Sequence, residues 1–171
     1  KGFMTRSFDV NIRPALLPER EIARKLIADR IERVDLVKAS DEDLSWLFPG
    51  RSPAETAAEW SSQGRIAILT RGADGAILFV RGASFPRPGF KVAVRDSVGA
   101  GDTFLAAFLA HANATGGLER LSEANSDEIG ALLDFANAAA ALCCMRAGAD
   151  APTRAETDAF LGASRSGLIS D

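Results

Sequence analysis

Short apolar runs alternate with longer segments of helical periodicity along this chain, and this alternation limits the possible folds more than any other feature of the sequence. We predict strands at residues 6–10, 35–39, 66–70 and 76–80. We predict helices at residues 18–34, 40–47, 52–64, 103–114, 127–146 and 154–161. Strands that alternate with helices predict an α/β protein with three layers, α/β/α, around a mostly parallel sheet whose ligands bind at the carboxyl ends of the strands.

Three segments need a separate interpretation. Residues 71–75 form a glycine-containing loop between two strand-like runs, so the pair of runs is expected to be a hairpin or a turn near a ligand. Residues 91–95 alternate in polarity and predict an edge segment of the sheet. His111 has no acid or cysteine at catalytic spacing, so we expect it on the surface of its helix.

Length and charge set the size of the domain and exclude one class of partner. The chain has 171 residues, of which 47% are hydrophobic, and this predicts a single domain over residues 1–171. Its net charge is −3, and Lys and Arg are scattered among acidic residues. Because no basic stripe is present, nucleic acid is excluded as a partner.

The cysteines and the most apolar segment indicate the environment of the protein. Cys143 and Cys144 are neighbours that cannot close a useful loop, so we expect small buried thiols in a reducing cytoplasm. Residues 131–145 are interrupted by Asp134 and Asn137. This interruption predicts a buried helix and no membrane span.

The segment Asp-Ser-Val-Gly-Ala-Gly-Asp, from Asp96 to Asp102, leads from an extended stretch into a helix. Backbone N–H groups in the first turn of a helix attract anions, and Gly99, Ala100 and Gly101 have too little bulk to keep a phosphate away. A Walker A loop needs Lys after its second glycine and a dinucleotide fingerprint needs a third glycine, so both are excluded. Asp102 suits a general base that accepts a proton from an attacking hydroxyl. The alternative is that Asp102 only complements the helix dipole.

Residues 96–104 resemble the second signature of the ribokinase-like (PfkB) family of carbohydrate kinases, which reads Asp-Thr-x-Gly-Ala-Gly-Asp. The other segments follow in the order found in the C-terminal half or more of such kinases, over nearly the whole chain. The resemblance implies a ribokinase-like fold and ATP-dependent phosphorylation of the primary hydroxyl of a sugar. It assigns the general base to Asp102 and the anion hole to the amides of Gly99, Ala100, Gly101 and Asp102.

The resemblance also assigns residues to the nucleotide. Thr70, Gly72 and Gly75 match a segment that lies against the ATP phosphates and ribose. Asn137 matches a helix position beside the adenine, with an ordinary polar residue on a helix face as the alternative. Gly148 matches the loop that closes the nucleotide pocket, and a helix C-cap explains this glycine equally well.

Two metal sites follow from the same resemblance. The family carries Asn-x-x-Glu near Mg²⁺ and the phosphates, and this chain has Ser40 and Asp43 at these positions. Asp43 is expected to act through water because it is shorter than Glu, Glu42 is the alternative acid, and the spacing also fits the start of a helix. Asp96 and the carbonyl of Val98 match a monovalent-cation site for K⁺, with a turn-capping Asp96 as the alternative.

Residues 8–14, Phe-Asp-Val-Asn-Ile-Arg-Pro, resemble the Asp-x-Asn-x-Arg-Pro run of fructokinases and 2-keto-3-deoxygluconate kinases. The resemblance implies a six-carbon sugar or sugar acid as the substrate. It places Asn11 and Arg13 near the phosphate and the acceptor, and assigns Asp9 to the same substrate site. A strand-to-loop turn built from these residues is the alternative.

Members of this family begin with a glycine-rich region that supplies sheet strands, a sugar-binding aspartate and a small β lid, and none of it is in this sequence. We therefore expect residues 1–171 to be one partial kinase domain that carries the nucleotide-binding half and binds ATP and a small sugar. The alternatives are a truncated, non-catalytic nucleotide-binding module and a nucleoside or sugar-phosphate kinase of the same family. If these 171 residues are the entire polypeptide, an exposed sheet edge at residues 6–10 favours association, for which a homodimer is the expected form.

Overall fold

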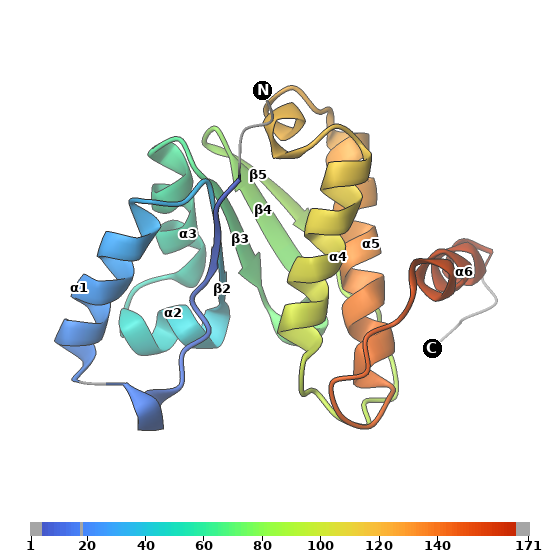
Figure 1. Cartoon of the computed structure of the whole chain (residues 1–171), viewed down its shortest axis with the longest axis horizontal. Coiled ribbons are helices and arrows are strands. Elements are labelled where there is room, and N and C mark those ends of the chain that lie inside the picture. The colour runs from blue at the N-terminus through green and yellow to red at the C-terminus, as the bar shows by residue number, and fades with distance from the viewer. Residues whose placement is uncertain (1–4, 18, 167–171) are drawn as a thin grey trace. The chain divides into compact units, whose positions relative to one another are not determined.

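The computed structural model describes residues 5–17 and 19–166, which form two compact units. Within these residues, unit 1 comprises 5–72 and Ile77–Pro86, and unit 2 comprises Ala73–Ala76 and 87–166. The first three helices belong to unit 1, and the later helices belong to unit 2 (Figure 1). Each unit is internally packed and is described by itself below.

One mixed sheet contains five strands, β1 (Ser7–Asp9), β2 (Leu36–Ser40), β3 (Ile66–Thr70), β4 (Ala76–Val80) and β5 (Ala83–Arg87). Their spatial order is their order in the chain. β1 pairs with β2 in parallel, with Asp9 opposite Lys38, and β2 pairs with β3 in parallel. Two residues, Arg81 and Gly82, link β4 to β5, and their φ angles of 51° and 77° are typical of the type I′ turn of an antiparallel hairpin.

Four predicted strands are present, and the fifth differs from the prediction. The runs at 66–70 and 76–80 form β3 and β4, and their connection of five residues is too short for a parallel crossover. Residues 91–95 were expected as an edge segment, but this prediction was wrong because Arg95 donates its N–H to the carbonyl of Cys144, 2.8 Å away, instead of to a strand. At this end of the sheet the edge strand is β5. β5 contains Pro86, and a proline is tolerated in an edge strand because its missing N–H is not needed there.

Unit 1 contains three α-helices, α1 (Arg20–Ile31), α2 (Asp41–Leu47) and α3 (Pro53–Ser62), and a 3₁₀ turn at Pro14–Leu16. α1 buries Ala23, Ile27 and Ile31, which lie four residues apart on one face. Ile27 and Ile31 belong to the same apolar core as residues of β2, α2 and β3. The hydroxyls of Ser40 and Ser52 cap α2 and α3 by accepting backbone N–H groups three residues later. Pro18, the expected opening residue of α1, lies outside the described residues.

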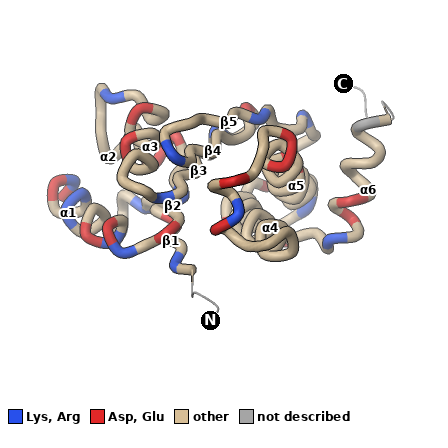
Figure 2. The backbone as a smooth tube through the Cα atoms, turned by 90° about the horizontal axis from the view of Figure 1, so that it is seen from above, with Lys and Arg blue, Asp and Glu red and all other residues tan. Residues whose placement is uncertain are grey.

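Acidic and basic residues alternate along the backbone of α1, as Figure 2 shows. Ion pairs join Arg24 to Glu21 and Arg33 to Asp29, close to or on this helix. The mixture of signs is that of a solvated helix surface.

Unit 2 contains α4 (Ala100–Ala114), a 3₁₀ segment at Leu118–Ser122, α5 (Ser126–Cys144) and α6 (Arg154–Arg165). α4 packs along α5, and α6 packs against α5. α6 was expected to end at residue 161 and continues four residues further. A capping box of Thr153 and Glu156 fixes its first turn, and the hydrogen bonds from Thr153 lower the pKa of Glu156 to about 2. Within the described part of the chain, no helix is both long and apolar enough to cross a membrane.

His111 was expected on the surface of α4, and this prediction was wrong. Its ring is half-buried, with its centroid 4.8 Å from that of Phe135 on α5. Nδ1 is buried and has no hydrogen-bond partner among the described residues. Burial lowers the pKa of His111, the charge of Arg154 lowers it further, and Asp158 opposes this shift.

We therefore expect the free energy of unfolding to fall as the pH decreases below about 6.5, the ordinary pKa of histidine. Above that pH the His111 side chain is neutral in both the folded and the unfolded protein. Below that pH the histidine of the unfolded chain binds a proton. Folded His111 binds this proton only when the pH reaches its own, lower pKa. Urea denaturation at a series of pH values measures this loss. Because His111 is the only histidine, His111→Gln should flatten the curve in this window, and an unchanged slope in the variant would contradict the assignment.

Candidate active site

The first turn of α4 is set by Gly99, which precedes the helix as its N-cap. Gly99 has a φ of 78°, in the left-handed region that favours glycine. A Cβ atom on Gly99 would lie 2.6 Å from the Cβ of Ala149, which is closer than two carbon atoms that are not bonded to each other can approach. Both the backbone conformation and the close approach of the loop at Ala149 therefore require glycine here.

This turn leaves backbone donors free at its outer end. Ala100 donates its N–H to the carbonyl of Ser97 at 3.2 Å, so one of the four predicted anion-hole amides already has an acceptor. The N–H groups of Gly99, Gly101 and Asp102 have no acceptor within the described residues. Asp102 is exposed in the first turn. The chain thus places a solvent-accessible carboxylate beside unpaired donors at the positive end of a helix.

Asp96 fixes the loop that leads into this turn. Its Oδ1 accepts the N–H of Val98 at 3.0 Å, and its Oδ2 accepts the N–H of Gly148 at 2.9 Å. These two backbone hydrogen bonds, that from Val98 foremost, lower the pKa of the Asp96 carboxyl. The carbonyl of Val98 accepts the thiol of Cys143, with the sulfur 3.7 Å away. The geometry is that of a turn-capping aspartate, which was the alternative to a cation ligand.

A second close backbone crossing in unit 2 involves Gly75. A Cβ atom on Gly75 would lie 2.2 Å from the carbonyl oxygen of Arg87 and 2.4 Å from the nitrogen of Gly89. The side chain of Asn137, which is buried in α5, donates its Nδ2–H to the carbonyl of Pro88 at 3.1 Å. Gly75 and Asn137, both predicted at the nucleotide, therefore hold the same segment, residues 87–89.

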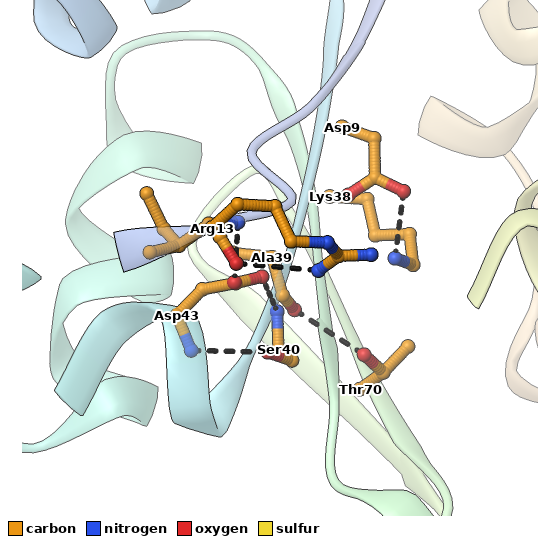
Figure 3. Close-up of polar contacts among 8 residues, drawn as sticks. Asp9, Arg13, Lys38, Ala39, Ser40, Asp43 and Thr70 are labelled. Atoms are coloured by element: carbon orange, nitrogen blue, oxygen red, sulfur yellow. Dashed lines mark hydrogen bonds and ion pairs between the residues drawn. The ribbon is translucent and has the colours of Figure 1, made fainter. Parts of the chain in front are cut away.

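The candidate residues of unit 1 gather at the carboxyl ends of its parallel strands, as Figure 3 shows. Asp9 ends β1, and Lys38 lies opposite it in β2, with Nζ 2.8 Å from Oδ2 of Asp9. The side chains of Asp9 and Lys38 are only 16% and 5% exposed. Thr70, at the end of β3, donates its hydroxyl to the carbonyl of Ala39 at 3.5 Å.

Asp43 uses both carboxylate oxygens on backbone donors. Oδ2 accepts the N–H of Ser40 at 2.8 Å, while the N–H of Asp43 donates to the Ser40 hydroxyl at 3.0 Å, which completes a capping box. Oδ1 accepts the N–H of Ile12, 31 residues away in the sequence, at 2.8 Å. Asp43 is buried, whereas Glu42 is exposed. The start of α2 and the loop after β1 are thus tied together by one side chain.

The loop after β1 presents two polar side chains. Asn11 has a φ of 41°, one of two positive φ values among the described residues that are not glycine, and asparagine is among the residues that tolerate it best. Arg13 is exposed and donates Nη1–H to the carbonyl of Ile12 at 3.2 Å. In Figure 3 its guanidinium extends over the strand ends toward Lys38.

Within unit 1 the structure places Asp9, Arg13, Asp43 and Thr70 near the carboxyl ends of the parallel strands, and Asn11 lies in the loop between Asp9 and Arg13. Within unit 2 it brings Asp96, Val98, Gly99 and Gly148 to one loop, and Gly75 and Asn137 to another segment. Among the described residues no group of three or more His, Cys, Asp or Glu side chains is arranged to hold a metal ion alone. Lys38 was missed by sequence reasoning because a single lysine in an apolar run reads as an ordinary strand residue. Its place opposite Asp9 follows from the register of β1 and β2, for which the sequence carries no local signal.

The comparisons with known proteins agree with this geometry. Residues 2–156 match the family described as pfkB family carbohydrate kinase. A fructokinase of Rhizobium leguminosarum bv. trifolii is 35% identical over 123 residues, which cover 71% of this chain and 38% of that protein. A 2-dehydro-3-deoxygluconokinase of Thermoproteus tenax is 38% identical over 107 residues, which cover 61% of this chain and 33% of that protein.

Solved structures of similar proteins cover almost the whole chain. The fructokinase of Xylella fastidiosa with bound ATP has a TM-score of 0.81 and 29% identity, and covers 93% of this chain and 52% of that one. A fructokinase double mutant of Vibrio cholerae, solved with fructose, ADP and potassium ion, has a TM-score of 0.79 and 27% identity, and covers 92% and 50%. This chain therefore spans about half the length of these structures and less of the curated relatives.

These likenesses define the class of the fold first: it is ribokinase-like, a three-layer α/β/α fold with a mostly parallel sheet, of which this chain spans about half. The match over residues 2–156 then identifies the family. The chain belongs to the pfkB family of carbohydrate kinases.

Gly99→Ala should lower the free energy of unfolding by about 1 to 3 kcal/mol, because the variant combines a strained left-handed alanine with a clash at Ala149. Urea denaturation measures the loss. Gly162→Ala is a matched control, because Gly162 lies in α6 with no atom near its added Cβ, and this change should raise stability by about 0.5 to 1 kcal/mol. Equal midpoints for Gly99→Ala and the unsubstituted protein would contradict the packing described here.

Proposed function

We propose that this chain is the nucleotide-binding and base-carrying part of a kinase that transfers the γ-phosphoryl group of ATP to a primary hydroxyl of a six-carbon sugar or sugar acid. The names of its relatives, fructokinase and 2-dehydro-3-deoxygluconokinase, support this substrate class. The observation that carries the proposal is the exposed carboxylate of Asp102 beside the unpaired N–H groups of Gly101 and Asp102.

In this mechanism Asp102 accepts the proton of the attacking hydroxyl. Phosphoryl transfer spreads negative charge over the equatorial oxygens of the transferred group, and catalysis consists mainly of alignment and of positive potential around them. The amides of Gly99, Gly101 and Asp102 and the dipole of α4 supply such potential, and Gly99 and Gly101 leave room for close approach. Ala100 contributes through the dipole because its own N–H is already bonded.

For Mg²⁺, the residues Glu42 and Asp43 fit an ion that takes one or two carboxylates together with phosphates and water. When bound, Mg²⁺ neutralises charge on the phosphates. Glu42 is exposed, and Asp43 retains further lone pairs beside its two backbone bonds, which supports contact through water. For K⁺, both carboxylate oxygens of Asp96 and the carbonyl oxygen of Val98 each accept one hydrogen bond and keep a further lone pair, which supports these oxygens as ligands of the ion.

Nucleotide contacts are proposed for Gly75, Asn137 and Gly148 within unit 2 and, separately, for Thr70 and Gly72 within unit 1. Gly148 donates its N–H to Asp96, so the loop assigned to the nucleotide pocket is tied to the loop that begins the anion hole. Asn137 holds Pro88 through its amide, and this supports a role in shaping the pocket. Substrate contacts are proposed for Asn11 and Arg13, which are exposed. Asp9 is largely buried and is proposed to act at the same substrate site indirectly, through the residues beside it.

We place this activity in the cytoplasm, because Cys143 and Cys144 are both free thiols and fit a reducing compartment. β1 lies at one edge of the described sheet, and if this chain is the entire polypeptide, that edge is open to pairing with a second copy in a homodimer.

In a version of the protein that spans the full length of its relatives, Asp102→Asn should lower kcat by at least about a hundredfold, because general-base catalysis contributes about 10² to 10⁴. The affinity for ATP should stay within about twofold of the unsubstituted protein, since the amide donors remain. A coupled ADP-release assay and isothermal titration with ATP and Mg²⁺ measure the two quantities.

Asp127→Asn is the matched control, because Asp127 is an exposed acid in the first turn of α5 and complements that helix dipole alone. It should leave turnover unchanged. If Asp102→Asn behaves like Asp127→Asn, the carboxylate of Asp102 only complements the dipole of α4, and its role as the base is rejected.

A further inference from the structure

Lys38 is a charged residue in the interior of unit 1. It lies in β2, its side chain is 5% exposed, and its Nζ contacts Oδ2 of Asp9 at 2.8 Å. Lysine is almost never buried in this way unless it is paired. The function proposed above gives Lys38 no task.

Stability alone does not explain this pair. Taking two charges out of water costs about as much as their attraction returns, and apolar replacements of buried ion pairs are often equally stable or more stable. A buried pair therefore invites a search for what its geometry holds in place. The Asp9–Lys38 pair lies at the end of β1, where the chain leaves the sheet. The loop that follows carries Asn11 and Arg13, which are assigned to the substrate.

The backbone after Asp9 is held on both sides of a strained residue. Val10 donates its N–H to the carbonyl of Lys38 at 2.9 Å, and Ile12 donates its N–H to Asp43 at 2.8 Å. Between them Asn11 adopts a φ of 41°. Such a conformation persists only where the surroundings over-determine it, and it is often found at functional sites.

We propose that Lys38 is a positioning residue that acts through Asp9. The ion pair fixes the end of β1, Asp43 fixes Ile12, and together they hold Asn11 and Arg13 in the orientation in which these exposed side chains meet the substrate. Lys38 does not bind the substrate itself, because its ammonium is buried against Asp9. This inference rests on the proposed kinase function and adds to it a residue that sets the geometry of the substrate loop.

The test replaces the ion pair by an apolar pair, Asp9→Leu with Lys38→Met, in a version of the protein that spans the full length of its relatives. The variant should remain folded, with a thermal midpoint close to that of the unsubstituted protein. Its kcat should fall by about tenfold to a hundredfold, as expected from misplacement of a substrate group, while the ATP dissociation constant stays within about twofold. Amide hydrogen exchange at Asn11 and Ile12 should become faster. Lys25→Met, on the exposed face of α1, is the matched control and should change none of these quantities.

Two further variants keep the test decisive. If the apolar pair does not fold, Asp9→Asn with Lys38→Gln keeps hydrogen-bonding groups without charge and should show the same loss of kcat. Lys38→Arg keeps the ion pair and should restore most of the turnover. A folded double variant with kcat within twofold of the parent overturns the proposal, and so does unchanged exchange at Asn11 and Ile12. If the parent itself transfers no phosphoryl group, the kinase function fails, and exchange still decides whether Lys38 holds the loop.

Discussion

The close approach of Gly99 to Ala149 is the constraint on which the loop before α4 and the first turn of this helix depend. Because no side chain fits between the two backbones, the loop before α4 can take a left-handed turn and deliver the helix with its first amides free. A larger residue would move the start of α4 and the carboxylate of Asp102 with it. The backbone conformation at one glycine thus determines where an acid and a set of donors lie relative to each other.

In each unit an aspartate carboxylate holds a loop in place, because its two oxygens accept N–H groups from different segments of the chain. Asp96 joins Val98 to Gly148 in unit 2, and Asp43 joins Ser40 to Ile12 in unit 1. Each carboxylate oxygen accepts one backbone N–H, so the first effect of both residues is to fix a loop. Residues that family resemblance assigns to metal ions therefore also determine the shape of the site.

The sequence predicted most of the fold because its signals are local. Apolar runs marked β3 and β4 correctly, and Ser52 with Pro53 marked the start of α3. β5 was missed because Pro86 is a poor strand residue except at an edge, and local alternation at 91–95 favoured a strand where the backbone of Arg95 bonds to α5.

The site was predictable only where a motif carried it. The signature at residues 96–102 led to Asp102 and its amides, but the bond from Ile12 to Asp43 spans 31 residues and has no local signal. The burial of Lys38 and of His111 depends on which strand or helix each one faces, and this is set by tertiary packing. The backbone partners of the Asp43 and Asp96 carboxylates are likewise set by tertiary contacts, and their roles at metal ions stay predictions.

The central claim is that the free amides of the α4 turn bind the terminal phosphate of ATP. Backbone ¹H–¹⁵N spectra recorded during titration with ATP and Mg²⁺, and separately with adenosine, test it most directly. The account predicts that the amide resonances of Gly101 and Asp102 shift with ATP and not with adenosine, while that of Ala100, already bonded to Ser97, shifts less. Resonances of Gly101 and Asp102 that stay in place when ATP is bound would contradict it.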